Sequence, residues 1–99
     1  VGEKNPYLMR IAFSTKYLHF GELVLPVGGH GCRISDPESH KGQTAIYVKS
    51  GVLCFIITET RETFKIYPGE VMYIPENCEY QMMNYEGEAA TAVFAISEL

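Results

Sequence analysis

Two stretches of the chain place side chains that can bind a metal ion or a polar ligand at fixed intervals. The first reads Glu38-Ser39-His40, three residues, Thr44, six residues, Gly51, and the second reads Gly69, five residues, Pro75, one residue, Asn77, two residues, Tyr80, three residues, Asn84. The His40 imidazole and the Glu38 carboxylate are good donors to a transition metal, whereas the Thr44 hydroxyl and the neutral Tyr80 phenol are poor ones. Two good donors do not hold such a metal tightly, so we expect neither a metal nor another cofactor here.

These side chains must be positioned by β-strands, because no stretch of the sequence keeps a helical period of apolar residues. Short runs rich in Val, Ile, Tyr and Phe recur instead between turn signals such as Lys49-Ser50-Gly51 and Pro68-Gly69. The expected strands cover Leu8–Ser14, Tyr17–Leu25, Thr44–Lys49, Val52–Thr58, Thr63–Tyr67, Val71–Ile74, Tyr80–Asn84 and Thr91–Ser97. About eight short strands at this spacing predict an all-β sandwich, jelly roll or small barrel.

The spacing of the two stretches resembles that of the two motifs of the cupin family, and together they cover about half of the chain. In that family His, His and Glu stand where this chain has Glu38, His40 and Thr44, and Gly and His stand where it has Asn77 and Tyr80. The resemblance implies a single cupin-type jelly-roll barrel whose metal site is degenerate. We expect His40 to lie at the barrel mouth, bonded to a neighbour, and Tyr80 to fill the core with its hydroxyl hydrogen-bonded.

Length, charge and cysteine content limit the possible functions. The chain has 99 residues, enough for one domain with one core, and a net charge of −4, which argues against a surface that binds nucleic-acid phosphates. Its longest apolar run, Val52 to Ile57, has six residues, against the roughly 20 of a membrane span. Three cysteines without a C-x-x-C spacing favour a reduced, intracellular compartment. The chain begins without Met, so we expect a piece of a longer protein, with residues 1–6 as a flexible leader and residues 26–43 as a long loop.

The long loop carries candidate catalytic groups of its own. His30 and Cys32 place a thiol near an imidazole, and Ser35, Asp36 and His40 lie close together along the chain. A flexible, Gly-rich loop does not fix the geometry that nucleophilic catalysis needs, so we expect no catalytic residue in it. A redox sensor acting through Cys32 is a weaker alternative, which unchanged function in Cys32→Ser would exclude.

Two of the expected strands are apolar on both faces. In Tyr17–Leu25 one of the faces includes Glu22, which marks it as the outer one, and in Val52–Thr58 the cupin register points every second apolar residue outward. An outward apolar row needs a cover, which is a partner, a second copy of the chain or a missing segment, unless the core itself covers both faces. We therefore predict a homodimer with Phe20 near the centre of its interface. The predicted interface residues are Leu18, Phe20, Val24, Cys54 and Ile56.

Among cupins with a degenerate metal site, the chain resembles the C-terminal domain of the centromere protein C (CENP-C) family, which are scaffolds of the inner kinetochore. Phe13-Ser14-Thr15, shortly before an apolar strand that ends in Leu25-Pro26, is similar to the opening strands of that family. His40-Lys41-Gly42-Gln43 is similar to its step into the third strand, and an Asn precedes a Tyr at the metal-His position. The longer loop at residues 27–33 and the place of Asn77 depart from the family pattern.

This resemblance implies a nuclear protein at centromeres that forms a homodimer and has no enzymatic activity. It also implies a docking platform for kinetochore, chromosome-segregation or centromeric-histone-loading proteins, with DNA contacts made by other segments of the long chain. The candidate docking residues are Tyr47, Tyr73 and Met82, the last beside His40 and Tyr80 at the barrel mouth.

The alternative function is that of a metal-dependent cupin enzyme or a small-molecule sensor that uses the barrel cavity. Its candidate residues are His40, Glu38 and Tyr80. The two missing imidazoles argue against this function. Near-stoichiometric iron, manganese, nickel or zinc that survives dialysis would favour it.

Overall fold

The computed structural model describes residues 8–26, 34–35, 37–84 and 87–97, which form eight β-strands. The strands are β1 (Leu8–Ser14), β2 (Leu18–Leu25), β3 (Thr44–Ser50), β4 (Leu53–Ile57), β5 (Glu62–Ile66), β6 (Val71–Ile74), β7 (Tyr80–Met83) and β8 (Ala90–Ser97). Every predicted strand is present, and each end lies within one residue of its predicted position. In these described ranges no helix is long and apolar enough to cross a membrane.

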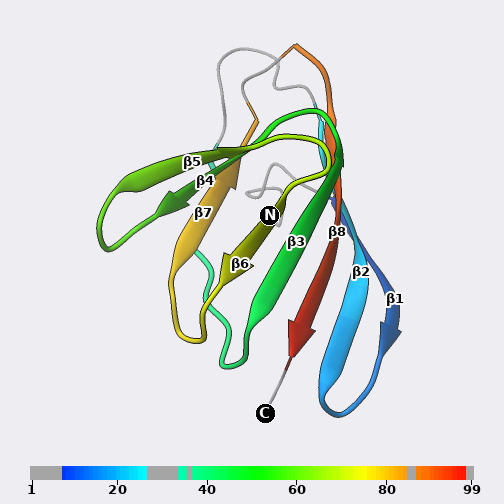
Figure 1. Ribbon diagram of the computed structural model, residues 1–99. Coiled ribbons are helices and arrows are strands. Elements are labelled where there is room, and N and C mark those ends of the chain that lie inside the picture. Colours follow the sequence, from blue (N-terminus) through cyan, green and yellow to red (C-terminus); the bar gives the residue numbers. More distant parts are fainter. Residues whose placement is uncertain (1–7, 27–33, 36, 85–86, 98–99) are drawn as a thin grey trace, which may run out of the picture.

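The strands form two antiparallel sheets, which confirms the predicted all-β jelly roll. One sheet has the order β1-β2-β8-β3-β6 and the other the order β5-β4-β7, and Figure 1 shows them as two layers. Side chains from the facing surfaces of both sheets make a single hydrophobic core. Its members include Leu23, Leu25, Ile46, Ile74 and Phe94 from the first sheet and Leu53, Phe55, Tyr80 and Met82 from the second.

The pairing register shows which side chains of the five-stranded sheet point outward. Leu23 and Leu25 of β2 are buried in the core, so their strand neighbours Phe20, Glu22 and Val24 point away from it, as predicted. The pairing of β1 with β2 shifts between Ile11 and Phe13, where β1 contains one extra residue in a β-bulge. Because of the bulge, Phe13 lies opposite Phe20 and also points outward.

The prediction for the three-stranded sheet was right in register and wrong in exposure. Leu53 and Phe55 fill the core, and Cys54 and Ile56 alternate with them. However, Cys54 is only 2% exposed, because β4 is the central strand and Cys54 lies between Lys65 of β5 and Met83 of β7. Cys54 is therefore unavailable for contact with a second chain.

The two parts of the predicted dimer interface lie on opposite sides of the molecule. Leu18, Phe20 and Val24 belong to the outer face of the five-stranded sheet, whereas Cys54 and Ile56 belong to the outer face of the three-stranded sheet. Because the two outer faces point away from each other in a two-layer fold, one two-fold interface cannot contain both sets. The predicted set of five residues is thus corrected to its β2 members.

Candidate functional site

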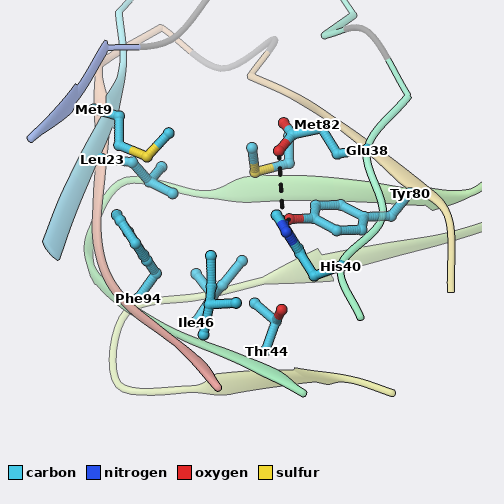
Figure 2. A pocket seen from close by; sticks show the side chains of 10 residues that line it. Met9, Leu23, Glu38, His40, Thr44, Ile46, Tyr80, Met82 and Phe94 are labelled. Carbon is cyan, nitrogen blue, oxygen red and sulfur yellow. Dashed lines mark hydrogen bonds and ion pairs between the residues drawn. The ribbon is translucent and has the colours of Figure 1, made fainter. Parts of the chain in front are cut away.

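The structure brings the four predicted site residues together at one end of the barrel. The nitrogen Nε2 of His40 lies 3.2 Å from the Tyr80 hydroxyl and 3.9 Å from Oε1 of Glu38. Tyr80 is 3% exposed, and its ring also packs against Phe55 at a centroid distance of 6.0 Å. The predictions of a neighbour-bonded His40 and a core-filling Tyr80 are therefore confirmed (Figure 2).

Backbone hydrogen bonds hold this group in place. Glu38 and Tyr80 exchange two of them, each 2.9 Å long, so the segment before β3 runs antiparallel to the start of β7. The amide of Asn77 donates to the His40 carbonyl over 2.7 Å, with Asn77 in the left-handed region at φ 59°. Cupins have Gly at this position, and Asn is among the few other residues that adopt the conformation readily. The substitution therefore preserves the turn that fixes His40.

The close approach of Gly42 to the end of β8 positions the segment between His40 and Thr44. A Cβ atom at Gly42 would overlap the Ser97 carbonyl group, which leaves no room for a side chain. Two hydrogen bonds also join Gln43 and Ser97: the Ser97 amide donates to the Gln43 carbonyl, and the Gln43 amide donates to Oγ of Ser97. The His40-Lys41-Gly42-Gln43 stretch is therefore a fixed connection rather than a loose loop.

A cavity opens beside these four residues, with about 310 Å³ of atom-free space that includes its open mouth. Glu38, His40, Thr44 and Tyr80 form its polar end (Figure 2). The remaining lining residues are apolar: Met9, Leu23, Ile46, Met82, Phe94 and Ile96. The predicted role of Met82 as a surface docking residue is wrong, because its side chain points into this interior and is 2% exposed.

Thr44 contributes a hydroxyl that lacks a partner. Within the described part of the chain, its Oγ1 is a buried side-chain atom with no hydrogen bond. A buried polar group in this state costs about 1–3 kcal/mol of folding stability. Thr44 takes the place of the Glu that completes a cupin metal site, so the orphan hydroxyl lies where a ligand atom would be expected.

The donors at this position do not fit the transition metal that the cupin fold implies. His40 and Glu38 supply one imidazole and one carboxylate, and the His40 Nε2 atom already contacts the Tyr80 hydroxyl. No group of three or more His, Cys, Asp and Glu residues suited to a metal exists in the described ranges. Tetrahedral or octahedral sites need more nitrogen, sulfur or oxygen donors than these two residues provide.

A second candidate site is the outer face of the five-stranded sheet. The register places five side chains in one row across all five strands, and we call this row the transverse row. Its members, in strand order, are Phe13, Phe20, Ala95, Ala45 and Tyr73. The rings of Phe13 and Phe20 stack at 5.5 Å, and Tyr73 at the other end is 55% exposed. Tyr47 and Val71 extend the apolar surface on the same side of the sheet.

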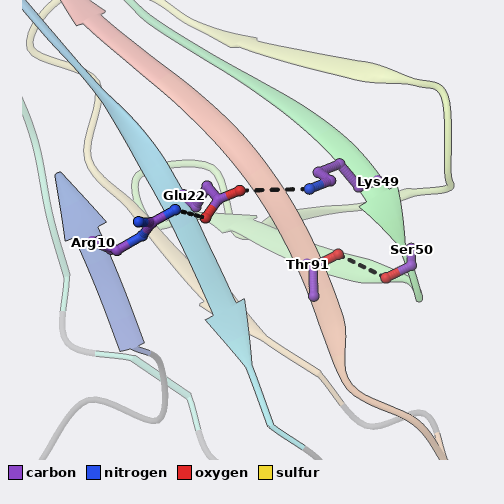
Figure 3. A network of polar contacts seen from close by, with 5 residues as sticks. All are labelled: Arg10, Glu22, Lys49, Ser50 and Thr91. Carbon is purple, nitrogen blue, oxygen red and sulfur yellow. Dashed lines mark hydrogen bonds and ion pairs between the residues drawn. The ribbon is translucent and has the colours of Figure 1, made fainter. Parts of the chain in front are cut away.

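A polar network borders this surface. Glu22 accepts a hydrogen bond of 2.7 Å from Arg10 and one of 3.5 Å from Lys49, and Ser50 and Thr91 share another of 2.7 Å (Figure 3). The Arg10 side chain, followed by Lys49, holds the pKa of the Glu22 carboxyl below its ordinary value. The network places one carboxylate between two cations and leaves an excess of positive charge beside the transverse row.

The sequence indicated Phe20, Tyr47 and Tyr73 as contact residues but not the other members of this surface. An alanine in a strand does not indicate from the sequence that it lies in an exposed apolar row. Phe13 lies on the outer face only because of the bulge in β1. The cross-strand register was the missing information. The loop candidates His30, Cys32 and Asp36 lie outside the described residues. Ser35 is buried, and its Oγ accepts a hydrogen bond of 2.8 Å from the Met82 amide.

No protein-family model and no curated protein matches the sequence. Solved structures match the fold with high scores, among them a cupin superfamily protein from Desulfitobacterium hafniense, with a TM-score of 0.80, 9% identity and coverage of 100% of this chain and 84% of that one. The fold is a cupin.

Two further neighbours differ in what their names state. The cupin domain of Schizosaccharomyces pombe Cnp3 has a TM-score of 0.82 and 13% identity, over 96% of this chain and 66% of that one. The polyketide cyclase RemF from Streptomyces resistomycificus has a TM-score of 0.78 and 17% identity, over 93% of this chain and 65% of that one. At these identities the similarity extends to the fold alone.

Proposed function

We propose that this cupin is a non-catalytic homodimerisation and protein-docking module of a centromere scaffold of the CENP-C family, acting in the nucleus at the kinetochore. The transverse row carries the proposal, because it is an exposed apolar strip across the whole five-stranded sheet. The loss of two imidazoles from the cupin donor set supports a role other than metal catalysis. The fold similarity to the Cnp3 cupin domain agrees with this family.

A second copy of the chain is the occupant that fits the transverse row best. A two-fold axis parallel to the strands and centred on β8 reverses the strand order of the facing sheet. Phe20 then lies opposite Ala45 of the second copy, and Ala95 lies opposite its own copy. A large side chain facing a small one is the complementarity that a closely packed isologous interface needs.

Dimerisation has a physical use in a long scaffold. It joins two chains, so that weak binding sites on their other segments act at a high effective concentration. Tyr47 and Val71, which are exposed on the same outer face of the single chain, are the candidate contacts for a kinetochore or histone-loading protein. Such a partner should carry acidic groups toward the Arg10–Glu22–Lys49 network.

The test compares one arginine on each outer face. Phe20→Arg puts an unpaired charge into the proposed interface, and we expect the dimer to weaken at least about a hundredfold in sedimentation at micromolar concentration. Ile56→Arg makes the same change on the three-stranded sheet, and we expect it to leave the oligomer unchanged. A Phe20→Arg protein that still sediments as a dimer would contradict the proposed surface.

A metal-dependent enzyme is the second candidate function, and the barrel cavity favours it. The cavity has a polar end formed by Glu38, His40, Thr44 and Tyr80, and the polyketide cyclase RemF has this fold. Metal analysis of the dialysed protein tests it directly. Near-stoichiometric iron, manganese, nickel or zinc would support the enzyme, and a metal-free protein would leave docking as the better function.

A further inference from the structure

We propose that the free edge of β6 binds an extended segment of another protein, which joins the five-stranded sheet as a further strand and carries basic residues at its ends. β6 ends this sheet in Figure 1, and within the described residues no strand pairs with its other side. The proposal specifies a partner for the docking part of the proposed function, on which it rests. It does not depend on the dimer, because a strand added in the plane of the sheet leaves the transverse row uncovered.

The pairing of β3 with β6 shows which backbone groups of β6 are free. The Val48 amide donates to the Glu70 carbonyl over 3.1 Å, which sets the alternation of hydrogen bonds along the two strands. In this alternation Met72 directs its amide and carbonyl toward β3, whereas Val71 and Tyr73 direct theirs to the free side. The side chains of Val71 and Tyr73 are 59% and 55% exposed, so an incoming backbone can reach these groups. An extended chain is the ligand that matches donors and acceptors at a two-residue interval.

The other sheet edges in the described part of the chain have protection that β6 lacks. β1 and β5 carry charged residues, among them Arg10 and Lys65. The edge of β7 is covered, because Ser35 and Glu38 form backbone hydrogen bonds with it. β6 reads Val-Met-Tyr-Ile, without a charge or a proline. Its four residues are too few for the stacking of whole sheets, but they are enough for one short peptide.

The outward side chains of β6 define the apolar part of the partner. A strand that pairs with Val71 and Tyr73 places its own alternate side chains beside theirs on the outer face of the sheet. Apolar, β-branched side chains pack well against an exposed valine and an exposed aromatic ring. The partner therefore carries two such residues separated by one position.

The charge around β6 selects a basic partner over an acidic one. Glu70 directly precedes the strand, Glu76 follows it by two residues, and both are exposed. No Lys or Arg occurs from residue 66 to residue 79. Lys49 of β3 donates instead to Glu22 of β2 over 3.5 Å. Cations at both ends of the partner strand thus meet carboxylates, and the acidic groups that suit the network around Glu22 belong to another part of the partner.

The experiment titrates the protein with a capped peptide of sequence KKVTVTKK and follows the hydrogen exchange of single amides by NMR. We expect the Val71 and Tyr73 amides to exchange at least about tenfold more slowly in the complex, and the Met72 amide, which faces β3, to change little. The same peptide with N-methyl groups on both valines lacks the donors that face β6, so we expect it to bind at least about tenfold more weakly. Equal binding of the two peptides would overturn the proposal.

The exchange of the Tyr73 amide in the protein alone tests the other possible occupants of this edge. Slow exchange that depends on protein concentration would mean that a second copy pairs with β6. Slow exchange at every concentration would mean that the chain itself covers the strand. Either result would overturn the proposal, and rapid exchange is the expected one.

A pair of variants assigns the binding to the backbone of β6. Tyr73→Pro removes the amide that faces the free side and keeps the hydrogen bonds with β3, so we expect peptide binding to be lost. Tyr73→Ala is the matched control, because it also removes the ring but keeps the amide, and the affinity should fall by no more than about threefold. Equal affinities of the two variants would contradict strand addition.

Two further comparisons test the charge and separate this site from the dimer. Glu76→Lys should weaken the peptide about threefold, whereas Glu59→Lys, the same change on the β4–β5 turn, should not. Phe20→Arg should bind the peptide as tightly as the wild type does, whatever happens to its oligomeric state. A failed dimer and a failed peptide site are therefore distinct results, and an unchanged affinity in Glu76→Lys would disprove the selection of a basic partner.

Discussion

Both sheets point apolar side chains away from the core, but only the outer face of the five-stranded sheet leaves a row of them exposed to a partner. On the five-stranded sheet, a row from Phe13 to Tyr73 lies open across every strand. On the three-stranded sheet, Cys54 is buried within the chain and Ile56 is flanked by the polar Thr63 and Gln81. The difference teaches that an outward register creates a binding surface only where the neighbouring strands leave it uncovered.

The largest expected effect comes from a charge placed on each face. Cys54→Lys buries an ammonium in a covered position, and we expect it to lower the free energy of unfolding by about 3 kcal/mol or more. Tyr47→Lys changes a side chain that is 46% exposed, and we expect it to change the free energy of unfolding by less than about 0.5 kcal/mol. Urea unfolding of both variants measures the contrast. A harmless Cys54→Lys would mean that the two faces are equally open.

A change of size in the transverse row should act on the dimer and not on the fold. Ala45 is exposed, so Ala45→Trp is accommodated in the isolated chain but clashes with Phe20 of the second copy in the proposed geometry. We expect dimer affinity to fall about a hundredfold in sedimentation experiments while the melting temperature of the monomer is kept.

The double variant Phe20→Ala/Ala45→Phe provides the control for this geometry. It exchanges the large and the small side chain, so it should restore part of the lost affinity relative to each single change. Dimerisation that is unaffected by Ala45→Trp would show that the two copies meet elsewhere.

A smaller effect is expected inside the barrel, between the two faces. Thr44→Val removes the unpaired hydroxyl and keeps the shape of the side chain, so the free energy of unfolding should rise by about 1 kcal/mol. Thr63→Val makes the same change at an exposed position on β5 and should have almost no effect. Denaturant melts of the two proteins compare the sites, and a destabilised Thr44→Val would mean that the hydroxyl has a partner.

The smallest expected effect is on how the melting temperature of the protein depends on pH. Because its cationic neighbours lower the pKa of Glu22 in the folded chain, its ionised form stabilises the fold above the unfolded-state pKa. This contribution is lost as the pH falls through the lower, folded-state pKa. Glu22→Gln should therefore reduce the drop in melting temperature between neutral and acidic pH, slightly and only at low salt, whereas Glu59→Gln should not. An identical pH dependence in wild type and Glu22→Gln would contradict the network.

The sequence predicted the strands and their inward and outward faces because both depend on local signals. Runs rich in Val, Ile, Tyr and Phe and turns such as Lys49-Ser50-Gly51 act over a few residues, and they located every strand end within one residue. Glu22 marked the outer face of Leu18–Leu25. The contact between His40 and Tyr80 followed from two motif spacings that the fold superimposes. These features required no knowledge of how the layers pack.

What the sequence did not predict depends on contacts between distant segments. The burial of Cys54 and Met82 is set by the strands beside and opposite them, which lie far away along the chain. The transverse row combines Phe13 and Tyr73, which no local pattern connects. The division of the predicted interface between two layers has the same cause, because one strand cannot reveal which sheet it joins.

The bulge in β1 has a consequence for the free edge of the five-stranded sheet. An edge strand exposes unpaired amides and carbonyls to any other extended chain, and β1 also exposes its apolar side chains. The extra residue between Ile11 and Phe13 breaks the even spacing of those amides and carbonyls, so another strand cannot form hydrogen bonds along the whole edge. Removing Ala12 would leave every observed β1–β2 pair possible and make that edge continuous. The bulge thus protects the protein from edge-to-edge association into fibres, so assembly takes place through the outer face of the sheet and not through its edge strand β1.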